Sequence, residues 1–149
     1  MRRLSALFLS LILVVMAAAA GRAEESRAMV RLPEPMQEHM LANMRDHLAT
    51  LNDIFGDLAQ GKFDAAAKLA EQRLGMSSLE LHGASHMAPY MPKPMQDIGT
   101  SMHRAASRFA IMVQNAAVTQ SFEAMKNVYG ALHEVTATCA ACHAGYRIR

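Results

Sequence analysis

The chain has 149 residues, enough for one domain, and carries 15 Lys and Arg against 13 Asp and Glu. Arg2, Arg3 and Arg22 lie in the first 23 residues, so the remainder carries 12 basic against 13 acidic residues. Binding of nucleic acid requires a basic face on the folded domain itself. The composition therefore excludes nucleic acid as a partner.

The N-terminus has the layout of a secretory signal peptide. Two arginines precede an apolar run over residues 4–20, and small residues offer cleavage after Ala20 or Ala23. An uncleaved membrane anchor is the alternative, but 17 residues are at the lower limit for a spanning helix. We predict that residues 1–23 are a cleaved signal peptide and that residues 24–149 form an exported, periplasmic bacterial domain, free of the membrane after cleavage.

A long first helix is predicted over residues 36–60, after a polar entry at 24–34. Pro35 suits the first turn, where a missing N–H matters least, and Gly61 ends the helix. Apolar residues recur at intervals of three and four, as on one face of a helix. This expected inward face consists of Met36, Met40, Met44, Leu48, Leu51, Phe55 and Leu58.

Three further helices are predicted. Asp64 can cap a second helix over about 65–74. Because of its prolines, the segment 76–95 is predicted to be a connection with at most a short turn. A third helix covers about 95–117. Thr119 or Ser121 can cap a fourth that runs to the C-terminal region, and no strand alternation is visible. The expected inward residues are Leu69, Leu74, Ile98, Met102, Ala105, Phe109, Met112, Phe122, Met125, Val128 or Tyr129, Leu132 and Val135. Short connections predict an all-α, antiparallel four-helix bundle.

The strongest motif is Cys139-Ala140-Ala141-Cys142-His143, in the last predicted helix. The i, i+3 spacing puts both thiols on one side of the helix, where they can add to the two vinyl groups of haem, and His143 follows as an iron ligand. A redox-active disulfide is the main alternative, but such motifs begin a helix beside a βαβ pattern. A zinc site would need more ligands at recognisable spacing. The motif predicts one covalently attached haem c.

The chain resembles the class II cytochromes c, which include the high-spin cytochromes c′ and their low-spin relatives. The resemblance rests on the C-terminal motif with Tyr146 and Arg147 after it, and on residues 44–61 leading into Lys62-Phe63-Asp64. It does not extend across 75–96. It implies a four-helix bundle with the second axial position facing the first helix, and it implies a homodimer through that helix as an alternative to a monomer.

The resemblance makes the residue opposite His143 decisive for function. Low-spin members place a Met there and carry electrons, whereas high-spin members leave the iron open to gases. Aligning residues 51–61 with the low-spin members selects Met44 as distal ligand, with Met40 as second choice and His47 as a further candidate. Arg147 is expected near a haem propionate, with a solvated terminal cation as the alternative. Tyr146 is expected to pack near the haem edge.

A Met- and His-rich segment lies between the second and third helices. Its members are His82, His86, Met87, Met91 and Met95, with His103 beyond. Thioether and imidazole groups can bind copper, especially Cu(I), but the prolines favour a rigid lid over the pocket. The leading interpretation of the whole sequence is a non-enzymatic periplasmic electron carrier that serves redox partner proteins. A five-coordinate protein binding nitric oxide or carbon monoxide is the alternative, and a copper-handling protein is a weaker third.

Overall fold

The computed structural model describes residues 25–149, and the predicted signal peptide, residues 1–23, lies outside them. The described chain is mostly helical with one short pair of strands, which confirms the all-α prediction. In chain order the elements are β1 (Ala28–Val30), α2 (Glu34–Ala59), α3 (Phe63–Arg73), α4 (Ala84–Met87), α5 (Lys93–Thr119), α6 (Phe122–Gly145) and β2 (Tyr146–Ile148). Two 3₁₀ turns, Met76–Ser78 and Ala88–Tyr90, flank α4.

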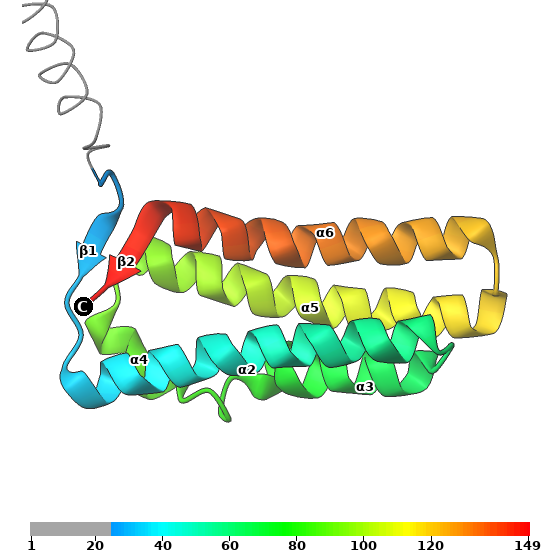
Figure 1. Ribbon diagram of the computed structural model, residues 1–149, viewed down its shortest axis with the longest axis horizontal. Helices are drawn as coiled ribbons and strands as arrows, with labels where there is room; N and C mark the ends of the chain where they lie inside the picture. The colour runs from blue at the N-terminus through cyan, green and yellow to red at the C-terminus, as the bar shows by residue number, and fades with distance from the viewer. Residues whose placement is uncertain (1–24) are drawn as a thin grey trace, which may run out of the picture.

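The four longer helices lie alongside one another (Figure 1). Contacts join α2 to α3, α3 to α5, and α5 to α6. The α2–α3 and α5–α6 turns lie at one end of the molecule, while β1, β2 and α4 gather at the other. The segment between α3 and α5 contains only single turns of helix, as its prolines predicted.

Local signals explain most helix ends. Pro35 is the second residue of α2, Gly61 adopts φ 73° just after that helix, and the Ser121 hydroxyl accepts a hydrogen bond from the Ala124 N–H at the start of α6. The predicted Asp64 cap is wrong. Helix α3 begins at Phe63, so Asp64 lies in its first turn, where a carboxylate still favours the positive end of the helix dipole.

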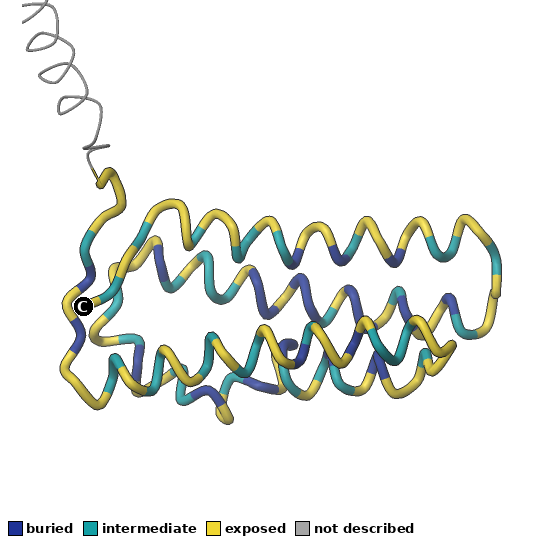
Figure 2. The backbone as a smooth tube through the Cα atoms, in the orientation of Figure 1, coloured by how far each residue is buried: buried dark blue, intermediate teal, exposed yellow. Residues whose placement is uncertain are grey.

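The main core lies between α2, α3, α5 and α6, as the buried residues on the helices' facing sides show (Figure 2). Phe109 and Val128 are fully buried there, as predicted. The predicted inward face of α2 is partly wrong, because Ile54 is fully buried whereas Leu48 is 71% exposed and Phe55 49% exposed. Phe122 and Tyr129 of α6 are also exposed, so Val128 is the inward residue of the predicted pair.

The strand pair is the feature that the sequence pattern did not indicate. β1 and β2 are parallel, with Ala28 opposite Tyr146 and Val30 opposite Ile148. Backbone hydrogen bonds extend the pairing from Leu32 N–H to the Arg149 carbonyl and from Arg149 N–H to the Val30 carbonyl, both at 3.1 Å. A second buried cluster, formed by Val30, Leu32, Met87 and Met95, lies at this end. The pairing therefore fixes the chain that follows α6 against the start of α2.

Over residues 25–149, no helix combines the length and the apolar composition needed to span a membrane.

Candidate functional site

A cavity of about 380 Å³ lies at the end of the molecule that carries the strands. Helices α2 and α6 make little direct contact with each other, and side chains of both line this cavity. The segment before α5 and the first turns of α5 complete the wall, which is largely apolar. The cavity is thus bounded by elements that are far apart in the sequence.

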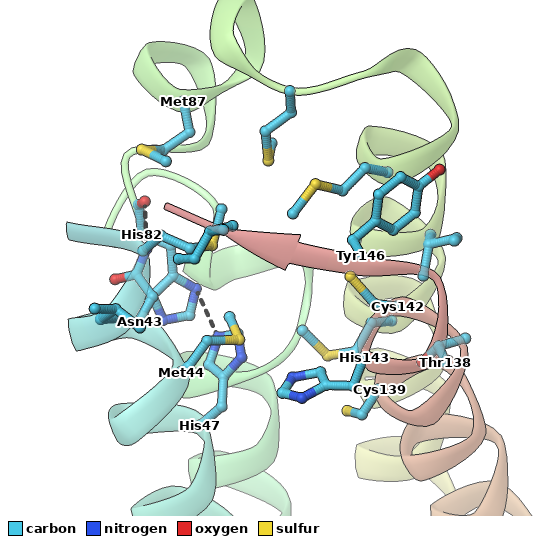
Figure 3. A pocket seen from close by; sticks show the side chains of 18 of the residues that line it. Asn43, Met44, His47, His82, Met87, Thr138, Cys139, Cys142, His143 and Tyr146 are labelled. Carbon is cyan, nitrogen blue, oxygen red and sulfur yellow. Dashed lines mark hydrogen bonds between the residues drawn. The ribbon is translucent and has the colours of Figure 1, made fainter. Parts of the chain in front are cut away.

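The predicted attachment residues line one wall of the cavity. Cys139, Cys142 and His143 occupy the last two turns of α6, and Figure 3 shows them on one side with Met44 and His47 of α2 across the cavity. Both cysteines are free and half-buried. The i, i+3 spacing therefore presents both thiols and the adjacent imidazole to one space.

Burial raises the pKa of both thiols; for Cys142 the proximity of Cys139 raises it further. Reactive CxxC pairs instead have a lowered pKa, typically at a helix N-terminus. These cysteines lie near the C-terminal end of α6, where the helix dipole disfavours a thiolate. The environment is therefore unlike that of a redox-active disulfide and keeps both sulfurs as neutral thiols.

Met40 and Met44 line the opposite wall, and both are half-buried. They lie one turn apart on α2, so both present their thioethers to the same space. Met36 is not part of the cavity wall and packs against the cluster at the strand end, which Met40 also contacts. The structure thus brings together the first and second choices for the distal ligand, facing the motif on α6.

The C-terminal residues lie at the edge of the same cavity. Tyr146 is half-buried and Arg147 exposed, and both line it as part of β2. Strand pairing adds Arg27, which the sequence did not single out and which forms an ion pair with Glu25 at 2.6 Å. Only the register of β1 on β2 brings Arg27 near Arg147, so no local pattern could have identified it. The cavity therefore has two guanidinium groups at its edge.

Three histidines also meet at the cavity. His47 of α2, His82 of the connecting segment and His103 of α5 have ring centres 4.6 to 5.9 Å apart. His47 Nε2 and His82 Nδ1 are 3.4 Å apart, and Figure 3 shows the two rings meeting. The sequence grouped His82 with His103 but left His47 apart, because 35 positions separate His47 from His82.

The imidazoles of this cluster are held neutral. Burial, together with the smaller effects of the neighbouring His82 and His103, lowers the pKa of His47 to about 4. Burial also lowers the pKa of His82 and of His103. The His103 Nδ1–H donates to the Leu74 carbonyl at 2.7 Å, which leaves Nε2 with its lone pair free.

Asp46 connects the cluster to α3. One of its carboxylate oxygens accepts from Arg73, and the other, Oδ2, is 3.7 Å from His82 Nε2. Both Asp46 Oδ2 and His82 Nε2 are buried and lack a hydrogen-bond partner. The carboxylate therefore faces the far nitrogen of His82 and favours the tautomer that carries a proton there.

The Met- and His-rich segment is divided by the fold. Met87 and Met95 are buried against Val30 and Leu32, whereas His86 is exposed. Only His82 of this segment joins the imidazole cluster. Across residues 25–149, no three His, Cys, Asp or Glu side chains stand ready as a metal site. Met87 and Met95 of this segment thus pack in the second buried cluster and also line the cavity.

Comparisons with family models, with curated proteins and with solved structures found no match to this chain. The chemistry of the site therefore rests on its own residues.

Proposed function

We propose that this protein is a c-type cytochrome that carries single electrons. The observation that carries the proposal is the cavity between α2 and α6, which has Cys139, Cys142 and His143 on one wall and Met44 on the other. Two thiols and an imidazole on one helical turn, facing a thioether, are the groups that attach haem c and provide both axial ligands.

The residues present fit such a group. The cavity volume of about 380 Å³ lies in the usual range for cofactor sites. The wall is apolar and rich in flexible thioethers, which adapt to a large flat molecule. The neutral, free thiols remain available for thioether bonds, and no disulfide occupies them.

When bound, haem supplies one-electron chemistry, because iron cycles between its ferrous and ferric states. Cys139 and Cys142 would hold the group, and His143 would supply a nitrogen ligand. Met44 would supply a thioether ligand, which favours the reduced state and raises the reduction potential. Arg147 would supply positive charge for the propionates at the edge of the cavity, which Arg27, paired with Glu25, also lines.

The proposal also covers the arrangement of the helices and the location of the protein in the cell. Helices α2, α3, α5 and α6 form the antiparallel four-helix bundle of the class II cytochromes c, which this chain resembles in α6 and in the second half of α2. Attachment takes place after export to the periplasm, and the partners are redox proteins there. The protein has no substrate of its own.

The absorption spectrum of the haem-loaded protein, oxidised and reduced, tests this function. We expect a six-coordinate low-spin spectrum with the weak Met–iron charge-transfer band, unchanged by carbon monoxide. A Cys139→Ala, Cys142→Ala variant should lose covalent haem, as measured by haem retained after acid–acetone extraction. A high-spin spectrum that shifts fully with carbon monoxide would contradict the Met ligand and make binding of nitric oxide or carbon monoxide the better function. Absence of covalent haem in the wild-type chain would overturn both.

A further inference from the structure

We propose that His47 and His82 bind one Cu(I) ion beside the cavity, as a second metal site distinct from the attachment motif. The two nitrogens that face each other, His47 Nε2 and His82 Nδ1, are 3.4 Å apart (Figure 3). An imidazole nitrogen bonds a transition metal at about 2 Å. Two such nitrogens around one three-coordinate ion are therefore roughly 3.5 Å apart, which is the spacing found here.

At this spacing the two rings share a long hydrogen bond, which a bound ion could replace. Good hydrogen bonds from N–H groups have donor–acceptor distances of roughly 2.7–3.2 Å, and the separation of His47 from His82 is longer. Burial also keeps both rings neutral near pH 7, so neither repels a cation. The buried His82 and the half-buried His47 thus face each other at a distance that a shared metal ion would satisfy.

Asp46 orients His82 for this role. Histidine ligands to metals commonly donate their other ring N–H to a carboxylate, which fixes the tautomer and strengthens the ligand. Here Asp46 Oδ2 lies 3.7 Å from His82 Nε2, and Arg73 holds the same carboxylate from the other side. A proton on Nε2 leaves the Nδ1 lone pair directed at His47.

The surroundings select copper over zinc. Zinc requires about four N, O or S ligands, and within the described part of the chain no third His, Cys, Asp or Glu completes a set. Cu(I) accepts two or three ligands and favours thioethers. The adjacent wall supplies a thioether that haem would not use, Met102 next to His103 on α5.

Equilibrium dialysis of the haem-loaded protein against buffered Cu(I) under anaerobic conditions, followed by copper analysis, tests the site. Free thiols are titrated and alkylated beforehand, so binding by Cys139 or Cys142 cannot contribute even if haem attachment fails. We expect one Cu(I) per chain. Free thiols in the wild-type chain would show that haem is not attached. Absence of bound copper would show that the proposed copper site does not exist.

Matched variants decide the assignment. His47→Gln and His82→Gln should each lose the bound copper, and Asp46→Asn should weaken binding by about 10-fold. His86→Gln, an exposed histidine of the same segment, should bind as the wild type does. Circular dichroism checks folding, and His47→Gln alone suffices if the more buried His82 variant does not fold.

Two results would overturn the proposal. Wild-type copper content in His47→Gln and His82→Gln would show that these rings are not the ligands. Parallel dialysis against Zn²⁺ that gives stoichiometric zinc, lost in the same two variants, would replace copper by zinc.

Discussion

Met40 and Met44 present the same functional group to the same cavity, one helical turn apart. Only one of them can occupy the position opposite His143. We expect Met44→Ala to abolish the Met–iron charge-transfer band and to make the haem reactive toward carbon monoxide. Met36→Ala, whose side chain packs against the strand-end cluster, should leave the spectrum unchanged. If Met40→Ala removes the band while Met44→Ala retains it, the ligand is Met40.

A second prediction concerns acid stability. The pKa of His47 falls from 6.5 to about 4 in the fold, so between these values the unfolded chain binds a proton that the folded chain does not. The stability conferred by the neutral ring is therefore complete above pH 6.5 and is lost as the pH falls toward 4. The loss is at most about 3.5 kcal/mol, at roughly 1.4 kcal/mol per pKa unit.

Urea unfolding at pH 7.5 and pH 5.0 measures this dependence. His47→Gln should lose less stability than the wild type between the two pH values. The exposed His133 offers a control, because His133→Gln should follow the wild-type dependence. An identical loss of stability in wild type and His47→Gln would assign the acid sensitivity to other groups.

At the scale of elements, the β1–β2 pair attaches the end of α6 to the start of α2. Val30 is 5% exposed and packs with Leu32, Met87 and Met95. We expect Val30→Ala to lower the free energy of unfolding by about 2 kcal/mol, because it removes two buried methyl groups and leaves a cavity. Chemical denaturation measures this change. Val118→Ala, at a site 88% exposed, should change stability by less than about 0.5 kcal/mol, and an equal effect of both would show that β1 contributes little.

The helices themselves were largely predictable. The sequence predicted α2 over 36–60 and α5 over about 95–117, and the structure gives Glu34–Ala59 and Lys93–Thr119. Pro35, Gly61 and Ser121 act within one turn, so their effects are visible without tertiary contacts. The sequence predicted less well which apolar residues of α2 face inward. Leu48 and Leu51 lie less than one helical turn apart, so both fit the same face, and apolar residues also occur on surfaces.

At the scale of the whole molecule, the misassigned Leu48 and Phe55 of α2 form an exposed apolar stripe together with Leu41. Leu41, Leu48 and Phe55 recur every seven residues and are all exposed, which is the spacing of a face that packs against another helix. We expect two copies to associate through this stripe, as the resemblance to class II cytochromes c also implies.

Sedimentation equilibrium tests the association. Leu48→Glu should raise the dimer dissociation constant at least about tenfold, because burying an unpaired carboxylate costs more than about 1.4 kcal/mol. Val118→Glu, which adds the same charge at another exposed position, should leave it unchanged. A monomeric wild-type chain at micromolar concentration would contradict this prediction.

The sequence by itself determined the helical class, the approximate helix ends and the placement of Cys139, Cys142 and His143 on one helix. Each of these depends on residues within a few turns: the spacing of Cys139 and Cys142, the prolines between 89 and 94, and the cap at Ser121. Met40 and Met44 were likewise identifiable from their spacing on one helix. Periodicity and capping are local properties, so the order of residues contains them directly.

Only the tertiary structure decided which distant groups meet. His47 and His82 approach each other because α2 and the segment after α3 fold together, and Arg27 reaches the cavity because β1 pairs with β2. The burial that lowers the pKa of His47 also depends on this packing. Contacts across 35 or more positions leave no periodic signal along the chain, since their energy comes from the fold as a whole.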